Sequence, residues 1–289
     1  MAQLATHTDG NTGPQDPERA VARPWPQRIA GALMLPKEHG AWAMLLMPYL
    51  LGTLVADWGA GRPSLLLLTS VLTLFTASRP LELALRERRS DAVVRLVLYA
   101  GLGSATGVFL MIGYQRWALL PLAATAGAAL GAQLLLRRRR LDRTWPARLV
   151  SIAALSAAAP AAYYASIGSL DHRAVALWLT AFLYSGASVF YVRLYYRPPT
   201  KRKTEAEEQA RRQMAAYVGV TAIVMIGAAA FGWFPPLGVA VMIPPALKLP
   251  VVWRKRDSRP SLKQIGMTEI AYSSLFVVLA TAAFILWRP

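Results

Sequence analysis

The residues that could bind a ligand or carry a proton fall into four short polar clusters, each beside a long apolar run. Charge is costly inside a membrane, so ionisable groups at the edges of apolar runs are candidates for a site. The candidate substrate-binding residues in these clusters are Glu38, His39, Arg79, Glu82, Arg193 and Glu269. For each cluster, the alternative is that it only anchors the chain in a bilayer.

The first cluster runs from Pro36 to Trp42 and contains Lys37, Glu38 and His39. A histidine can carry a proton or contact an anion near neutral pH. In the alternative interpretation, Lys37 binds lipid phosphate and Glu38 favours the positive end of a helix that begins here. Both interpretations place the start of a helix at this cluster.

The second cluster leaves an apolar run and contains Arg79, Glu82 and Arg86. Residues three and four apart on a helix share a face, so Glu82 can pair with Arg79 or with Arg86. The same segment also fits a solvated surface helix. The spacing therefore leaves a paired site and an ordinary surface helix as equal alternatives.

The two remaining clusters offer groups that could bind anions. Arg193 and Arg197 are four residues apart, so their guanidinium groups share a helix face that suits a phosphate or a carboxylate. Glu269 lies inside the last apolar run, where it could pair with Lys248 or with Lys263. The alternatives are a basic membrane anchor for the arginines and a helix-terminus carboxylate beside a lipid-binding lysine for Glu269.

Several chemistries are excluded by what the sequence lacks. It has no cysteine, so disulfides, thiolate metal sites and a cysteine nucleophile are out. It has no Walker pattern, no His-Glu-x-x-His and no Gly-x-Ser-x-Gly. The three histidines, His7, His39 and His172, are scattered, so we predict no metal site and identify no cofactor.

The composition requires a second apolar environment besides a protein core. The 289 residues are 55% hydrophobic and 16% charged, whereas soluble domains average about 45–50% apolar and about 25% charged. A helix needs about 20 apolar residues to cross a bilayer, and a backbone in lipid must satisfy its own hydrogen bonds. We therefore predict an all-α, polytopic transmembrane bundle of nine helices: 40–56, 63–78, 96–113, 117–136, 149–168, 174–195, 215–234, 237–252 and 267–287.

The basic residues predict how this bundle is oriented. The chain carries 32 Lys and Arg against 15 Asp and Glu, a net charge of +17. With nine spans, all but four of the basic residues fall on one side; the four are Arg62, Arg116, Arg173 and Arg288. The positive-inside rule then predicts a cytoplasmic N-terminus and an external C-terminus. Because the charge serves topology, we expect membrane lipid and no nucleic acid as partner.

Two segments depart from plain membrane-spanning helix. Residues 1–34 are polar and have no apolar stretch of the kind found in signal peptides, so we predict a disordered cytoplasmic tail before a transmembrane domain at 35–289. The pair Pro244–Pro245 lies within the eighth span. Proline removes a helix hydrogen bond, so we expect a bend or break there.

The string Leu35-Pro36-Lys37-Glu38-His39-Gly40-Ala41-Trp42 resembles the opening signature of the YwiC-like family of bacterial membrane proteins. Further similar features are Arg79-Pro80 with Glu82, the stretch 191–193, and the pattern Lys263, Gly266 and Glu269. The resemblance covers most of the chain from Leu35 on, and it implies a protein of the bacterial inner membrane without implying a particular activity.

A second resemblance, to the UbiA-like prenyltransferases, rests on nine helices, a lysine-led first span and charged loops after the second and sixth spans. It implies a membrane cavity for a prenyl diphosphate, held through Mg²⁺ bound by two Asp-rich motifs. This chain departs from those motifs. It has Glu82, Glu87 and Asp91 at the first position, and Tyr191, Arg193 and Arg197 at the second.

Three functions follow as hypotheses. The first is binding of an isoprenoid or quinone-like lipid, with its anionic head in a cytoplasm-facing pocket lined by the six candidate residues. The second is proton-coupled transport of a small molecule through His39, Glu82 and Glu269. The third is a non-enzymatic assembly partner of another membrane complex. The sequence leaves enzymatic activity and oligomeric state undecided.

Overall fold

Helices account for nearly all of the chain that the computed structural model describes, which comprises residues 39–56, 61–87, 90–141, 144–195, 203–254 and 261–287. The predicted tail at 1–34 and the candidate residue Glu38 lie outside these ranges. The helices are α2 (His39–Val55), α3 (Gly61–Glu87), α4 (Ser90–Gly113), α5 (Leu119–Arg138), α6 (Trp145–Ser156), α7 (Ala158–Ile167), α8 (His172–Tyr195), α9 (Lys203–Ala230), the 3-10 helix η2 (Pro236–Met242), α10 (Ile243–Arg254) and α11 (Leu262–Leu286).

Each of the nine predicted spans has a counterpart among these helices. Eight are long and apolar enough to cross a membrane, and α2 supplies a shorter apolar helix at Trp42–Val55. Several helices extend beyond the predicted spans: α3 continues past residue 78 to Glu87, α4 begins at Ser90 instead of at 96, and α9 begins at Lys203 instead of at 215. The added segments are rich in Leu, Ala, Glu and Arg, which favour helix without contributing an apolar run. The all-α membrane fold is thus confirmed.

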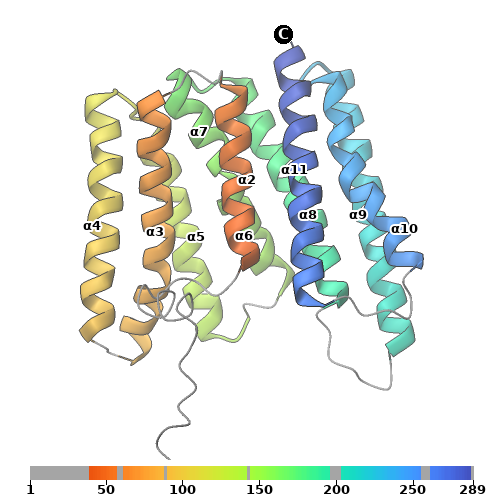
Figure 1. Ribbon diagram of the computed structural model, residues 1–289, viewed down its shortest axis with the longest axis horizontal. Helices are drawn as coiled ribbons and strands as arrows, with labels where there is room; N and C mark the ends of the chain where they lie inside the picture. The colour runs from red at the N-terminus through yellow and green to blue at the C-terminus, as the bar shows by residue number, and fades with distance from the viewer. Residues whose placement is uncertain are drawn as a thin grey trace, which may run out of the picture. The chain divides into compact units, whose positions relative to one another are not determined.

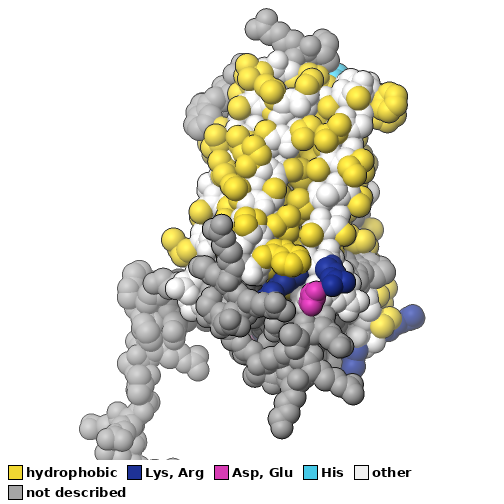
Figure 2. Space-filling view, turned by 90° about the vertical axis from the view of Figure 1, so that its right-hand side faces the viewer, with side chains coloured by type: hydrophobic (Ala, Val, Ile, Leu, Met, Phe, Trp, Pro, Cys, Tyr) yellow, Lys and Arg dark blue, Asp and Glu magenta, His cyan; other side chains and the backbone are white. Residues whose placement is uncertain are grey.

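The outside of the bundle is apolar. In α4, for example, Val97 and Leu98 are more than 60% exposed, and only three residues of this helix are buried. Figure 2 shows hydrophobic side chains over most of one face, with Lys, Arg and acidic side chains gathered near one end. A broad apolar surface of this kind is unstable in water, whereas lipid solvates it. The protein is therefore a multi-pass membrane protein.

The centre of the bundle is α7, which has eight consecutive buried residues from Ala158 to Ala165. Five of these are alanines, whose small side chains let neighbouring backbones come close. The helix packs against α2 and α8 and also contacts α3 and α5. It ends at Gly168, whose φ of +92° is the left-handed cap that glycine adopts without strain.

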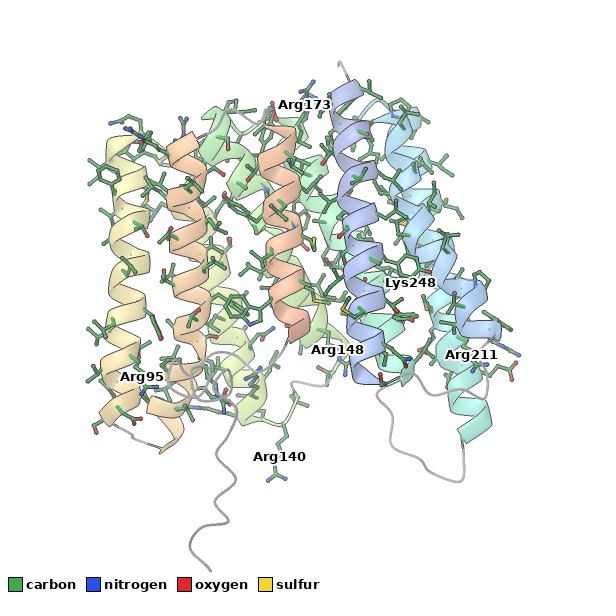
Figure 3. The ribbon with its side chains drawn as sticks, in the orientation of Figure 1. Arg95, Arg140, Arg148, Arg173, Arg211 and Lys248 are labelled. Carbon is green, nitrogen blue, oxygen red and sulfur yellow. The ribbon has the colours of Figure 1, made fainter. Side chains whose placement is uncertain are left out.

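The basic residues lie mainly at one end of the bundle, as the sequence predicted. Figure 3 shows Arg95, Arg140, Arg148 and Arg211 at the end where α3, α5, α8 and α10 finish, and Arg173 at the opposite end. We call the first of these the basic end. The C-terminus lies at the other end (Figure 1). The chain crosses the bundle an odd number of times from α2 to α11, so the start of α2 and the end of α11 lie at opposite ends.

Two spans are interrupted by proline. One span is divided into α6 and α7 at Ala157, three residues before Pro160. The other changes from the 3-10 helix η2 to α10 at Ile243, and Pro244 and Pro245 occupy the first turn of α10. Proline fits the first turn because the N–H groups there have no partner within the helix. The predicted break in the eighth span is confirmed.

Candidate functional site

The packing of α4 against α3 fixes which of their residues lie at the same level. The Ser70 hydroxyl donates to the carbonyl oxygen of Gly103 at 2.7 Å, and a Cβ atom on Gly103 would overlap Leu74 and Thr73. The two helices run in opposite directions (Figure 1). Glu82 is eight residues beyond Leu74 on α3, and Arg95 is eight residues before Gly103 on α4, so the two residues lie at one level near the basic end.

Glu82 is the centre of the first polar cluster. Its Oε2 atom lies 3.4 Å from Nη1 of Arg79 and 3.2 Å from Nη1 of Arg137. Arg137 comes from α5, so the carboxylate joins two helices at the basic end. The Nη1 atom of Arg95 is buried and has no hydrogen-bond partner in the part of the chain that the structure describes. We call these four residues the Glu82 cluster.

The Glu82 cluster has more donors than its own acceptor can satisfy. Three guanidinium groups each present planar N–H donors, and Glu82 offers one carboxylate between two of them. Burying a donor without a partner costs free energy, so the Arg95 nitrogen is a place where an incoming acceptor would be stabilised. Arginine binds phosphate and carboxylate groups through two parallel hydrogen bonds. The cluster can therefore bind an oxyanion.

Apolar helix surface leads away from this cluster along the bundle. In α5 only Leu119 is buried, and it lies at the end of the helix far from Arg137. In α4 the buried residues are Ala92, Gly103 and Leu110, while Val94 and Leu98 are well exposed. The exposed surface of each of these two helices away from the basic end is therefore apolar and compatible with a long hydrocarbon tail.

The second polar cluster is built around Lys248, whose side chain is 0% exposed. Its Nζ atom donates to Oε1 of Glu269 at 2.7 Å and to the hydroxyl of Ser188 at 3.2 Å. The pair joins α10 to α11, and Ser188 belongs to α8. At α11 a capping box between Ser261 and Gln264 fixes the start of the helix and thereby the position of Glu269.

Three tyrosine rings enclose the same ammonium group. The distances from Nζ of Lys248 to the ring centroids are 5.6 Å for Tyr184, 5.1 Å for Tyr191 and 5.2 Å for Tyr272. Ring faces attract a cation and do so more strongly where water is excluded. We call Lys248, Glu269, Ser188 and these three tyrosines the Lys248 cluster. Figure 3 shows Lys248 among the C-terminal helices and Arg95 among the N-terminal ones.

The six residues predicted from sequence are thus distributed over different places. Arg79 and Glu82 lie together in the first cluster, and Glu269 lies in the second, where its predicted pairing with Lys248 is confirmed. His39 begins α2 and Arg193 lies in α8, but their side chains, like Glu38, lie outside the described residues. The ligand-binding roles of all six stay predictions.

Sequence reasoning missed Arg95, Arg137, Tyr184 and Tyr272, and it noted Tyr191 only at the position of the second Asp-rich motif. A signal for the second cluster was present, because Tyr184, Ser188 and Tyr191 are four and three residues apart and share one face of α8. No comparable local signal existed for Arg137, which is 55 residues from its partner Glu82.

Comparison with known proteins gives two matches. Residues 35–163 match the family model described as YwiC-like protein. The expected resemblance to the YwiC-like family is confirmed over these residues. A curated relative from Bacillus subtilis (strain 168), named "Uncharacterized protein YwiC", is 28% identical over 170 residues, which are 58% of this chain and 70% of the relative. No solved structure matches the chain. The YwiC-like segment contains α2 to α7 apart from the last residues of α7, and with them all four residues of the Glu82 cluster.

Proposed function

We propose that this protein binds an isoprenoid or quinone-like lipid, with the anionic head of the lipid at the Glu82 cluster. The observation that carries the proposal is the buried, unpartnered Nη1 atom of Arg95 at the level of a carboxylate already shared by two arginines. An oxyanion there would supply the missing acceptor and offset the excess of positive charge. Glu82 would hold Arg79 and Arg137 in position for it.

The membrane fold explains why the ligand would be a lipid. The three arginines lie at the end of α3, α4 and α5, and the exposed side chains of α4 and α5 away from that end are apolar. A molecule with an anionic head and a long hydrocarbon tail fits both surfaces at once. Basic groups between transmembrane helices are a common way to bind such heads.

We further propose that the basic end faces the cytoplasm of a bacterial inner membrane, following the positive-inside rule. Alkaline phosphatase is active only after export, so a fusion at the C-terminus is expected to be active. The matched control is a fusion after Arg140, at the basic end (Figure 3), which is expected to be inactive. Activity of the Arg140 fusion with an inactive C-terminal fusion would reverse the proposed orientation.

Replacing an arginine of the Glu82 cluster is expected to weaken binding of a prenyl diphosphate. Arg95→Gln and Arg79→Gln each remove hydrogen bonds to a charged group, which are worth about 1.5–3 kcal/mol. This corresponds to a loss of affinity of about 10-fold to 100-fold. Binding of farnesyl diphosphate to the purified full-length protein, measured by native mass spectrometry, provides the test.

The controls separate the cluster from general charge attraction. Arg140→Gln removes the same charge from an exposed residue at the basic end and is expected to leave affinity within about 2-fold of the original protein. Uncharged farnesol lacks the anionic head, and inorganic diphosphate lacks the hydrocarbon tail. Both should bind more weakly than farnesyl diphosphate. An equal loss in the Arg140→Gln and Arg95→Gln proteins would contradict the proposal.

A further inference from the structure

The Lys248 cluster lies on α8, α10 and α11, outside the YwiC-like segment, and the inference drawn from it does not depend on the proposed lipid site. Two opposite charges lie next to each other within the bundle, 2.7 Å apart. Packing α10 against α11 does not require an ion pair, because apolar residues of similar size often stabilise such a contact equally well. The unusual cost of this pair makes it a candidate for a second site.

Apolar residues close the cluster on both sides along the bundle axis. Towards the basic end, a hydrophobic cluster contains Val252, four residues beyond Lys248, and Ile265, four residues before Glu269. In the other direction, Tyr184 stacks on Phe276 at 3.9 Å, and both belong to the largest hydrophobic cluster. The ion pair is therefore a thin polar layer between two apolar ones, and its charges are compensated chiefly by each other.

The two partners differ in accessibility. Lys248 is 0% exposed, whereas the side chain of Glu269 is 14% exposed. Of the two groups, the carboxylate is therefore the more accessible, whereas the ammonium is enclosed by the tyrosine rings. If Glu269 became neutral, a buried cation would remain without a counterion, which is a strongly unfavourable state. Protonation of Glu269 is therefore favoured when a new negative charge arrives to replace its carboxylate.

We propose that Lys248 and Glu269 form a proton-linked site for a small aromatic carboxylate. In the exchange, the Glu269 carboxylate takes up one proton and becomes a neutral acid. The carboxylate of the ligand replaces it as the counterion of the Lys248 ammonium, which keeps its proton. One proton and one monovalent anion enter together, so the net charge of the site does not change.

The groups around Lys248 define the class of ligand. The ammonium and the Ser188 hydroxyl are 3.2 Å apart, so both can donate to one carboxylate. The rings of Tyr184, Tyr191 and Tyr272 enclose the ammonium, so they must move apart to admit a ligand, and an aromatic ring that enters with the carboxylate would then pack against them. A doubly charged phosphate would add one negative charge more than the single proton compensates. A monovalent aromatic carboxylate satisfies all three conditions.

Among the described side chains near Glu269, Lys248 provides its counterion. The tyrosines come from α8 and α11, and their ring faces surround the ammonium. From α2 the described titratable side chain is Tyr49, which bonds to Ser64 of α3. From α9, Arg211 lies one turn before Met214, a member of the hydrophobic cluster on the basic side. The coupling thus concerns Glu269 and Lys248.

Benzoate is a suitable probe for this site. We expect the full-length protein in detergent micelles to take up one proton for each benzoate bound. Isothermal titration calorimetry in buffers with different ionisation enthalpies measures this number directly. Over the range in which benzoate and Lys248 keep their charges and Glu269 is ionised in the free protein, one coupled proton also makes the affinity rise about 10-fold for each pH unit lowered. Both measurements use the unaltered protein, so they do not depend on a variant that folds.

Variants then assign the coupling to its residues. Glu269→Gln keeps a hydrogen-bond acceptor for Lys248 but removes the competing charge, so benzoate should bind at least 10-fold more tightly and without proton uptake. Lys248→Met should lose at least 10-fold in affinity. The matched control Glu208→Gln removes a carboxylate of an exposed pair with Arg212 on α9 and should behave like the original protein.

Three results would overturn the proposal. The first is absence of benzoate binding to both the original protein and the Glu269→Gln variant. The second is binding without proton uptake in the original protein, or proton uptake that persists after Glu269→Gln. The third is unchanged affinity in the Lys248→Met protein. Failure of farnesyl diphosphate to bind would affect the Glu82 cluster alone and leave this inference intact.

Discussion

Glu269→Leu is expected to lower the free energy of unfolding by about 3–5 kcal/mol, because it leaves a buried cation without its partner. Lys248→Met should cost less, since the remaining carboxylate is 14% exposed and can be hydrated or protonated. The double variant Lys248→Met with Glu269→Leu removes both charges and fills the space with apolar groups. We expect it to recover most of the stability lost in the single variants.

Reversible unfolding by sodium dodecyl sulfate in mixed micelles measures all four proteins under one condition. The decisive quantity is the coupling free energy of the double-mutant cycle, which isolates the interaction between the two residues. A further control is Glu208→Leu, which breaks the exposed ion pair on α9 and should change stability by less than about 1 kcal/mol. Additive losses in the double variant would show that Lys248 and Glu269 do not stabilise each other.

Gly52→Val is expected to prevent the native packing of α2, at a cost of about 3 kcal/mol or more. A Cβ atom on Gly52 would overlap the carbonyl oxygen of Ala159 on α7. Backbone cannot rotate away as a long side chain can, and Ala159 is itself 0% exposed. The added side chain must therefore push α2 away from the central helix.

The measurements for Gly52→Val are the yield of monodisperse protein after purification and its thermal stability in detergent. Gly101→Ala provides the matched control, because a Cβ atom at Gly101 of α4 would meet nothing within 4 Å. That protein should purify like the original, with unchanged or slightly higher stability, since alanine favours helix over glycine. Equal behaviour of the two variants would disprove the close α2–α7 contact.

The fold could be predicted well from the sequence because lipid leaves few choices. A long apolar run must be helical in a membrane. Loops rich in basic residues must also alternate with loops that have few of them if the basic residues are to gather at one end of the bundle. The errors lie where this constraint ends. Arg79 to Glu87 and Lys203 to Arg212 are too polar to register as spans, yet they continue α3 and α9 without a break.

The candidate site could be predicted only where the signal was local. Glu269 was found because an acid inside an apolar run is rare, and two lysines nearby limited its partners. The complete burial of Lys248 depends on three helices packing around it, which no spacing within α10 reveals. Likewise, the contact between Arg137 and Glu82 depends on how α5 meets α3. Such long-range contacts follow from tertiary packing and produce no periodic pattern in the sequence.

The central position of α7 has a consequence for the synthesis of the protein. Its neighbours α2 and α3 are made before it, but α8 emerges from the ribosome only afterwards. Until then, a segment of mainly alanine and tyrosine must remain in the bilayer with one side open to lipid. Alanine contributes little to membrane insertion compared with leucine or isoleucine. The earlier helices must therefore retain α7 during translation, and the close approach at Gly52 gives them a surface for doing so.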